Sequence, residues 1–127
     1  ARAKSRGTAP AYLYQFTRVP PMLRNSGLGA MHGAEIPYVF QTLRGNVGEA
    51  DRTLSDTMSA AWVRFAHTGN PNGAGLPAWP AYTPAGDWHM DFGANTVTSG
   101  LEKDACDLYD RIRAQRPPGE VAGLAEF

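Results

Sequence analysis

The 127-residue sequence contains a single cysteine and no excess of charge of either sign. Cys106 alone can form neither an internal disulfide nor a cysteine-based zinc site. The twelve basic and twelve acidic residues cancel and are scattered along the chain, so no basic stripe is available for nucleic acid or an anionic membrane. These absences exclude a disulfide-rich scaffold and argue against a nucleic-acid partner.

Long apolar runs are also absent. The run from Ile36 to Phe40 is far shorter than the roughly 20 apolar residues that a membrane-spanning helix needs. The N-terminal stretch ARAKSRGTAP has no apolar segment behind its positive charges. We therefore expect a soluble segment with no membrane span and no signal peptide, and the compartment is left open.

The sequence does have enough apolar residues, 43% in all, to form a core. Fourteen glycines and ten prolines make it rich in turns. We treat residues 1–127 as one segment, belonging to one domain at most.

Two segments show strand patterns. The aromatic run from Tyr12 to Thr17 lies between prolines and predicts a buried strand. Between Trp88 and Phe92, large apolar residues alternate with His89 and Asp91, which predicts a half-buried strand with His89 on its polar face. The loop after the first strand runs to His32 and is about eleven residues long, a length that often marks a functional loop.

Two further segments show a helical pattern. The first has apolar residues at the spacing of one helix face: Leu54, Met58, Ala61, Trp62 and Phe65. Asp51 or Thr53 is the expected N-cap, and Gly69 marks the end. The second amphipathic helix is predicted over Glu102–Gln115. We also expect a last helical turn over residues 1–5 and a mobile polar tail after Pro118.

These four elements cannot cover one another's apolar faces in any common two-layer architecture. The pattern therefore indicates a segment of a larger sheet.

His32 lies in the stretch GAMHGAEIPYVF, between Gly29 and Gly33. These glycines permit unusual backbone angles and leave space beside the ring. Glu35 precedes an apolar run, where a carboxylate must be hydrogen-bonded or protonated. Local chemistry alone leaves both a structural and a catalytic role open for His32, and Glu35 could simply anchor the loop.

The other two histidines point to structural roles. His67 lies near the end of the first helix, where its partial positive charge suits the helix dipole, and His89 lies on the expected polar strand face. A zinc site built from all three histidines is disfavoured, because no two of them have the close spacing of a paired ligand set.

GAMHGAEIPYVF resembles the histidine loop of the type-B carboxylesterase and cholinesterase family, serine esterases with the α/β-hydrolase fold. Four other blocks are similar to the family in the same order: YLYQFTR to the strand before that loop, AAWVRFAHTGNPN to the following helix and turn, LPAWPAY to the tryptophan-proline segment, and DACDLYDRI to the C-terminal helix. By this resemblance, residues 1–127 are identified as the C-terminal segment of such an enzyme, without its N-terminal part. The implied fold is a mixed, mostly parallel sheet flanked by helices and incomplete on its own.

The resemblance implies that His32 is the general base of a serine, histidine and Glu/Asp triad. It places Gly33 and Glu35 beside the triad as supporting residues rather than catalytic ones. It also implies an acyl-serine intermediate, a small-molecule ester substrate, and no metal or organic cofactor. The family has the chain order serine, acid, histidine, so the serine, the acid and the oxyanion donors are expected in an upstream portion.

The sequence also departs from the family pattern. No G-x-S-x-G surrounds any serine of the sequence, Ser26, Ser55, Ser59 and Ser99 included, and no HGGG-like stretch is present. An alternative is therefore a non-catalytic binding or adhesion module of the same fold. A third reading, a stand-alone small domain that binds a ligand through exposed aromatics, is disfavoured because the chain is expected to begin inside a helix.

Cys106 resembles a position that pairs with an upstream cysteine in some extracellular members of the family. Its helical spacing also predicts a place near the buried face of the second helix, where it would be an inert free thiol. We favour the free thiol.

Overall fold

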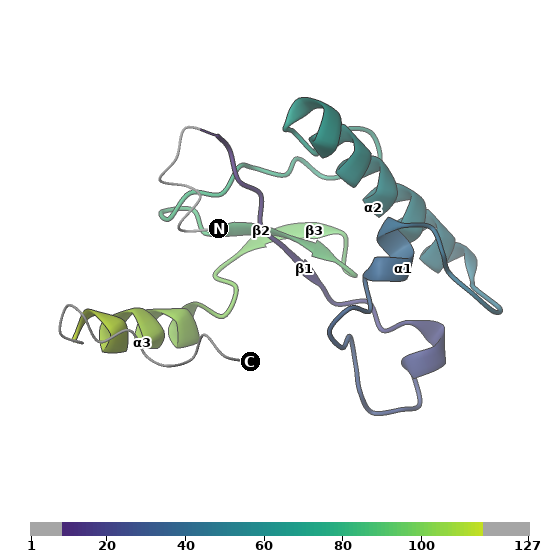
Figure 1. Ribbon diagram of the computed structural model, residues 1–127, viewed down its shortest axis with the longest axis horizontal. Helices are drawn as coiled ribbons and strands as arrows, with labels where there is room; N and C mark the ends of the chain where they lie inside the picture. The colour runs from purple at the N-terminus through teal and green to yellow at the C-terminus, as the bar shows by residue number, and fades with distance from the viewer. Residues whose placement is uncertain (1–8, 116–127) are drawn as a thin grey trace, which may run out of the picture.

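The computed structural model describes residues 9–115, which form one small sheet with helices around it (Figure 1). In chain order the elements are β1 (Tyr14–Phe16), the 3-10 helix η2 (Pro21–Leu23), α1 (Ile36–Val39), α2 (Glu49–Thr68), β2 (Trp88–Phe92), β3 (Thr96–Ser99) and α3 (Lys103–Ala114). The helical turn expected at residues 1–5 and the tail expected after Pro118 lie outside the described residues. No helix within residues 9–115 is both long and apolar enough to cross a membrane.

The sheet is mixed, with the strand order β1-β2-β3. β1 and β2 are parallel, with Tyr14 opposite Met90 and Phe16 opposite Phe92, and the connection between them carries α1 and α2. β2 and β3 form an antiparallel hairpin. Both predicted strands are present, although β1 is shorter than Tyr12–Thr17 and is half-buried rather than buried, and β3 was not predicted.

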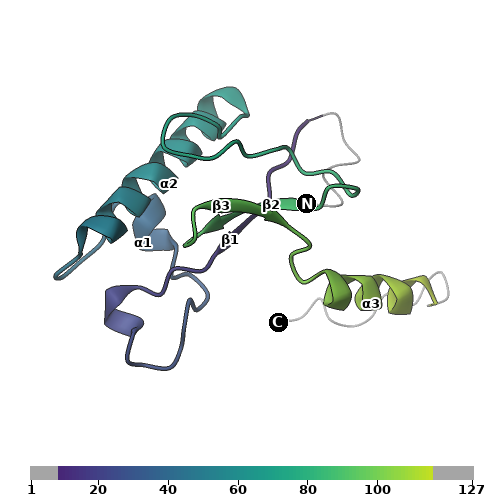
Figure 2. The same cartoon turned by 180° about the vertical axis from the view of Figure 1, so that it is seen from behind.

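α2 packs against one face of this sheet, as both views show (Figures 1 and 2). The ring of Trp62 lies 5.0 Å from that of Tyr14 and 5.7 Å from that of Phe92, between ring centroids. The buried core cluster consists of Tyr38, Met58, Trp79, Met90 and Phe92. The predicted apolar stripe therefore forms the packing surface of α2, although Phe65 at its edge is 45% exposed.

The long connection after α2 is held by its aromatic residues. Trp79 and Tyr82 are each 4% exposed. The indole Nε1 of Trp79 also donates a hydrogen bond of 3.0 Å to the carbonyl oxygen of Leu13, next to β1. This connection therefore packs on the sheet despite its many glycines and prolines.

The predicted end of α2 is confirmed, but its predicted N-cap is not. Gly69 ends the helix in the left-handed conformation at φ 74°, and its N–H bonds to the Phe65 carbonyl at 2.8 Å, as expected. The expected N-cap was wrong: Gly48 is the N-cap, and Asp51 lies inside the first turn. The carboxylate of Asp51 binds side chains from other parts of the chain instead of capping the helix.

The alternation predicted for β2 is only partly observed. Met90 and Phe92 are buried on the core face, but Trp88 on the same side is 41% exposed. His89, expected on the polar face, is only 4% exposed, and its Nδ1 has no partner among the described residues. The solvent-facing assignment of His89 was therefore wrong.

α3 is present where the second helix was predicted, but none of its residues is buried. In both views it projects away from α2 and the sheet (Figures 1 and 2). Cys106 is an exposed free thiol, so the expectation that it lies near a buried face is wrong for this structure. Leu108, Tyr109 and Ile112 are also exposed, and they leave an apolar face of α3 uncovered by the described residues.

Candidate active site

His32 lies in a series of tight turns that leads into α1. The N–H of Ala34 bonds to the carbonyl of Met31 at 3.1 Å, and the N–H of Ile36 bonds to that of Gly33 at 3.2 Å. α1 follows directly, with Pro37 in its first turn, where the missing N–H costs nothing. The exposed imidazole is therefore carried by a short backbone segment that is continuous with a helix.

Gly33, predicted beside the ring, has φ +80°, a conformation that side-chain-bearing residues rarely adopt. A Cβ at this position would meet only Ile36 Cδ1, at an ordinary 3.6 Å. The unusual backbone angle predicted at Gly33 is therefore confirmed. A requirement for empty space next to its Cα is not confirmed. Gly33 permits the turn that presents His32.

His32 borders an apolar groove of about 630 Å³ between η2, the histidine turns and the loop after α1. Its apolar walls include Pro20, Pro21, Leu23, Met31, Leu43 and Val47. A concave apolar surface next to one titratable ring has the composition of a small-molecule site. The sequence indicated a loop of functional length here.

Glu35 is half-buried at the start of α1. Its carbonyl accepts the N–H groups of Tyr38 and Val39 at 2.9 and 3.0 Å, which starts the helix. Burial raises the pKa of the Tyr14 hydroxyl, and the nearby Glu35 carboxylate raises it further. Within residues 9–115 no hydrogen bond joins Glu35 to His32, so the two side chains do not form a hydrogen-bonded pair in this structure.

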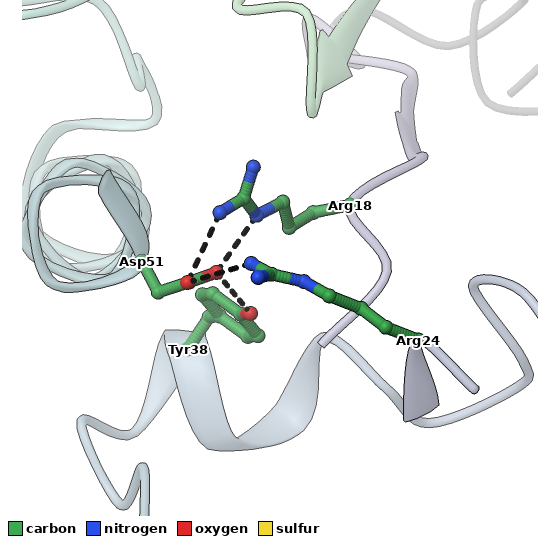
Figure 3. Close-up of polar contacts among 4 residues, drawn as sticks. All are labelled: Arg18, Arg24, Tyr38 and Asp51. Atoms are coloured by element: carbon green, nitrogen blue, oxygen red, sulfur yellow. Dashed lines mark hydrogen bonds and ion pairs between the residues drawn. The ribbon is translucent and has the colours of Figure 1, made fainter. Parts of the chain in front are cut away.

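An ion cluster around the buried carboxylate of Asp51 was not predicted (Figure 3). Asp51 of α2 is 1% exposed. Arg18, just after β1, donates to both of its oxygens, from Nε to Oδ1 at 2.7 Å and from Nη2 to Oδ2 at 3.0 Å. The hydroxyl of Tyr38 in α1 donates to Oδ1 at 2.8 Å, and Arg24 after η2 makes an ion pair with Oδ2 at 3.6 Å. One carboxylate thus joins four parts of the chain.

The charges of this cluster are mutually stabilised. Hydrogen bonds from Arg18 hold the pKa of Asp51 below its usual value against the opposing effect of burial. Burial, and then the hydrogen bond to Asp51, raises the pKa of Tyr38 to about 12. Asp51 is therefore ionised and Tyr38 neutral at neutral pH. Helical spacing already placed Asp51 in line with Ser55 and Met58 on the buried face, and that signal could have identified it.

The remaining polar candidates do not form a second site. Ser26 and Ser55 each donate a hydroxyl to a backbone carbonyl, at 2.8 Å in both cases. His67 is exposed in the last turn of α2, as predicted. No group of three or more potential metal ligands occurs in the part of the chain that the structure describes.

The fold is that of known esterase structures. The structure superposes on a PNB esterase with a TM-score of 0.74 at 30% identity, over 84% of this chain and 22% of that one. This chain therefore has part of an α/β-hydrolase fold, as the sequence predicted.

The family follows from the sequence comparisons. The model of the carboxylesterase family matches residues 1–109. The chain is 34% identical to the liver carboxylesterase of Sus scrofa over 93% of its length, and 39% identical to carboxylesterase 1E of Mus musculus over 91%. The chain belongs to the carboxylesterase family. It spans 22% of the length of each of these two relatives.

Proposed function

We propose that this chain supplies the general base, His32, of a serine carboxylic-ester hydrolase. The nucleophilic serine, the triad acid and the oxyanion donors would come from an upstream portion of the same enzyme, with this chain as its C-terminal segment. The single observation that carries the proposal is an exposed imidazole, held on a glycine turn beside an apolar groove, in a chain of the carboxylesterase family.

In this mechanism a ring nitrogen of His32 takes the proton of the serine hydroxyl while the serine oxygen bonds to the ester carbonyl carbon. The carbon–oxygen bond to the alcohol then breaks, and the imidazolium returns the proton to the leaving oxygen. Water repeats the sequence and releases the acid. Imidazole suits both steps, because its unperturbed pKa lies near neutrality.

Two further observations support the proposal. The apolar walls next to His32 suit the apolar part of a small-molecule ester. Two large apolar side chains that line the groove are exposed, Met22 at 73% and Met31 at 46%. Exposed large apolar side chains that line one groove are typical of a surface that a ligand or another part of a protein covers.

The test uses the complete protein, in which this chain is joined to its upstream portion, and p-nitrophenyl esters as substrates. We expect His32→Ala to lower kcat by at least about a thousandfold, because the serine loses its base. His67→Ala is the matched control and should stay within about twofold of wild type, since surface substitutions away from a site have small effects.

A His32→Ala protein that retains full turnover would contradict the proposal. A complete protein that binds esters but turns none over would favour the non-catalytic module instead. The 127-residue chain alone should show no turnover above that of free imidazole, because a base without a nucleophile has no proton to take.

A further inference from the structure

The loop that carries His32 has little apolar packing of its own. Met22, Leu28 and Met31 along it are 73%, 60% and 46% exposed. η2 is a single turn without a buried residue. Burial of apolar side chains among the described residues therefore does little to fix the path of this loop.

The ion cluster around Asp51 supplies such contacts on both sides of His32. Arg18 and Arg24 precede His32 in the chain, and Tyr38 follows it; all three bind the Asp51 carboxylate (Figure 3). The donors on the two flanks share the same acceptor group, so the loop is closed at its base by one side chain of α2.

The flank after His32 is the more firmly fixed. Tyr38 is fully buried, its ring lies 5.1 Å from that of Phe16, and its carbonyl accepts the hydroxyl of Ser55 at 2.8 Å. From Tyr38 back to Met31, hydrogen-bonded turns follow without a break. A shift of Tyr38 would therefore be passed along the backbone to His32.

We propose that Asp51 is a positioning residue for His32: by binding Arg18, Arg24 and Tyr38 it fixes the histidine turns and thereby the orientation of the imidazole. The inference rests on the proposed function. Asp51 does not line the groove next to His32. It acts by limiting how far the base can move from the serine, and a misplacement of about 1 Å can cost about a hundredfold in rate.

The test is made in the complete enzyme with kcat expressed per active site, counted by titration with a fluorophosphonate. Asp51→Asn keeps the side-chain shape but removes the charge that two arginines bind. We expect kcat per site to fall by about tenfold or more while KM changes by less than about threefold, the pattern of a lost transition-state interaction. Phosphonylation of the serine should slow in parallel, because it uses the same base.

Tyr38→Phe removes one hydroxyl donor and keeps the ring packing, so it should lower kcat per site in the same direction by about two- to fivefold. Glu49→Gln is the matched control. Glu49 is an exposed acidic residue in the same first turn of α2, so this change reproduces the loss of negative charge near the helix N-terminus without touching the cluster. It should leave kcat and KM unchanged.

If Asp51 has a purely structural role, its replacement should lower the number of active sites that react with the fluorophosphonate, or the thermal midpoint. The kcat of each remaining active site should then stay unchanged. That result for both variants would overturn the inference. If Asp51→Asn does not fold, Tyr38→Phe alone decides, because it preserves the buried packing. An inactive His32→Ala with a fully active Asp51→Asn would refute only this inference, whereas a fully active His32→Ala would refute the proposed function.

Discussion

The helices α2 and α3 have the same kind of amphipathic sequence but different surroundings. α2 buries Asp51, Ser55, Met58 and Ala61 against the sheet and the histidine loop, whereas no residue of α3 is buried. The periodicity of a sequence thus predicts that a helix forms and which face is apolar, but not whether the covering surface lies in the same chain. The region around α2 is packed by residues of this chain and includes the candidate base, His32. α3 is not packed by the described residues and contributes no candidate catalytic residue.

The largest expected effect on stability is in the α2 core. Met58 is fully buried, so Met58→Ala should lower the free energy of unfolding by about 2–5 kcal/mol, through lost burial and the cavity left behind. Val63 on the same helix is 54% exposed, and Val63→Ala should cost well under about 1 kcal/mol. Denaturant unfolding of the complete protein measures both. Equal losses would show that α2 does not pack as described.

Glu35→Gln should have an intermediate effect on activity, lowering kcat about tenfold, or about 1.4 kcal/mol in the barrier, by changing the charge near the histidine turns. Glu49→Gln is a useful control, because it removes a carboxylate at an exposed position in the first turn of α2. Steady-state kinetics and the thermal midpoint are the readouts. Wild-type values for Glu35→Gln in both would refute a supporting role for Glu35.

The contributions of Asp51 and Tyr38 to the free energy of unfolding should depend on pH. The pKa of Asp51 is held low, so its contribution to stability is complete above the unfolded value of 3.8 and is lost as the pH falls through the lower folded value. The pKa of Tyr38 is raised to about 12, so its contribution is complete below 10.0 and is lost as the pH rises toward 12.

Unfolding free energies measured from pH 2 to 5 should therefore fall less steeply with acid in Asp51→Asn than in wild type. Above pH 10, the unfolding free energy of Tyr38→Phe should fall less steeply with rising pH than that of wild type. Parallel curves for variant and wild type would mean that these groups titrate alike in the folded and unfolded states.

The smallest effect within the isolated 127-residue chain is expected on α3. Leu108 is 51% exposed, so Leu108→Ser should change the helicity and the unfolding midpoint of this chain very little. In the complete enzyme, the same substitution should cost about 1–3 kcal/mol if an upstream surface covers this face. A negligible loss of stability in both proteins would show that this face of α3 is exposed in the complete enzyme as well.

The features that the sequence predicted depend on neighbours along the chain. The stripe of α2 and its end at Gly69 follow from local spacing and one backbone conformation. The histidine loop was found through the resemblance of consecutive residues. β3 was missed because Thr96–Ser99 is mostly exposed and is defined by its pairing with β2.

The features that were missed or wrong depend on distant partners. Asp51 was taken for a cap because its main partner, Arg18, lies 33 residues earlier in the chain. His89 was assigned to solvent because strand alternation says nothing about what covers the second face of a sheet. Cys106 was placed near a buried face because the helix pattern was read as burial, and the described residues offer α3 no cover.

The most direct test of His32 as the general base is to locate the reactive serine and ask whether His32 activates it. The complete protein is labelled with a fluorophosphonate and digested, and the labelled peptide is identified by mass spectrometry, for wild type and for His32→Ala. We predict the label on a serine upstream of these 127 residues, with labelling slowed by about a thousandfold in His32→Ala. A label on Ser26, Ser55, Ser59 or Ser99, or an upstream label formed equally fast without His32, would contradict the account.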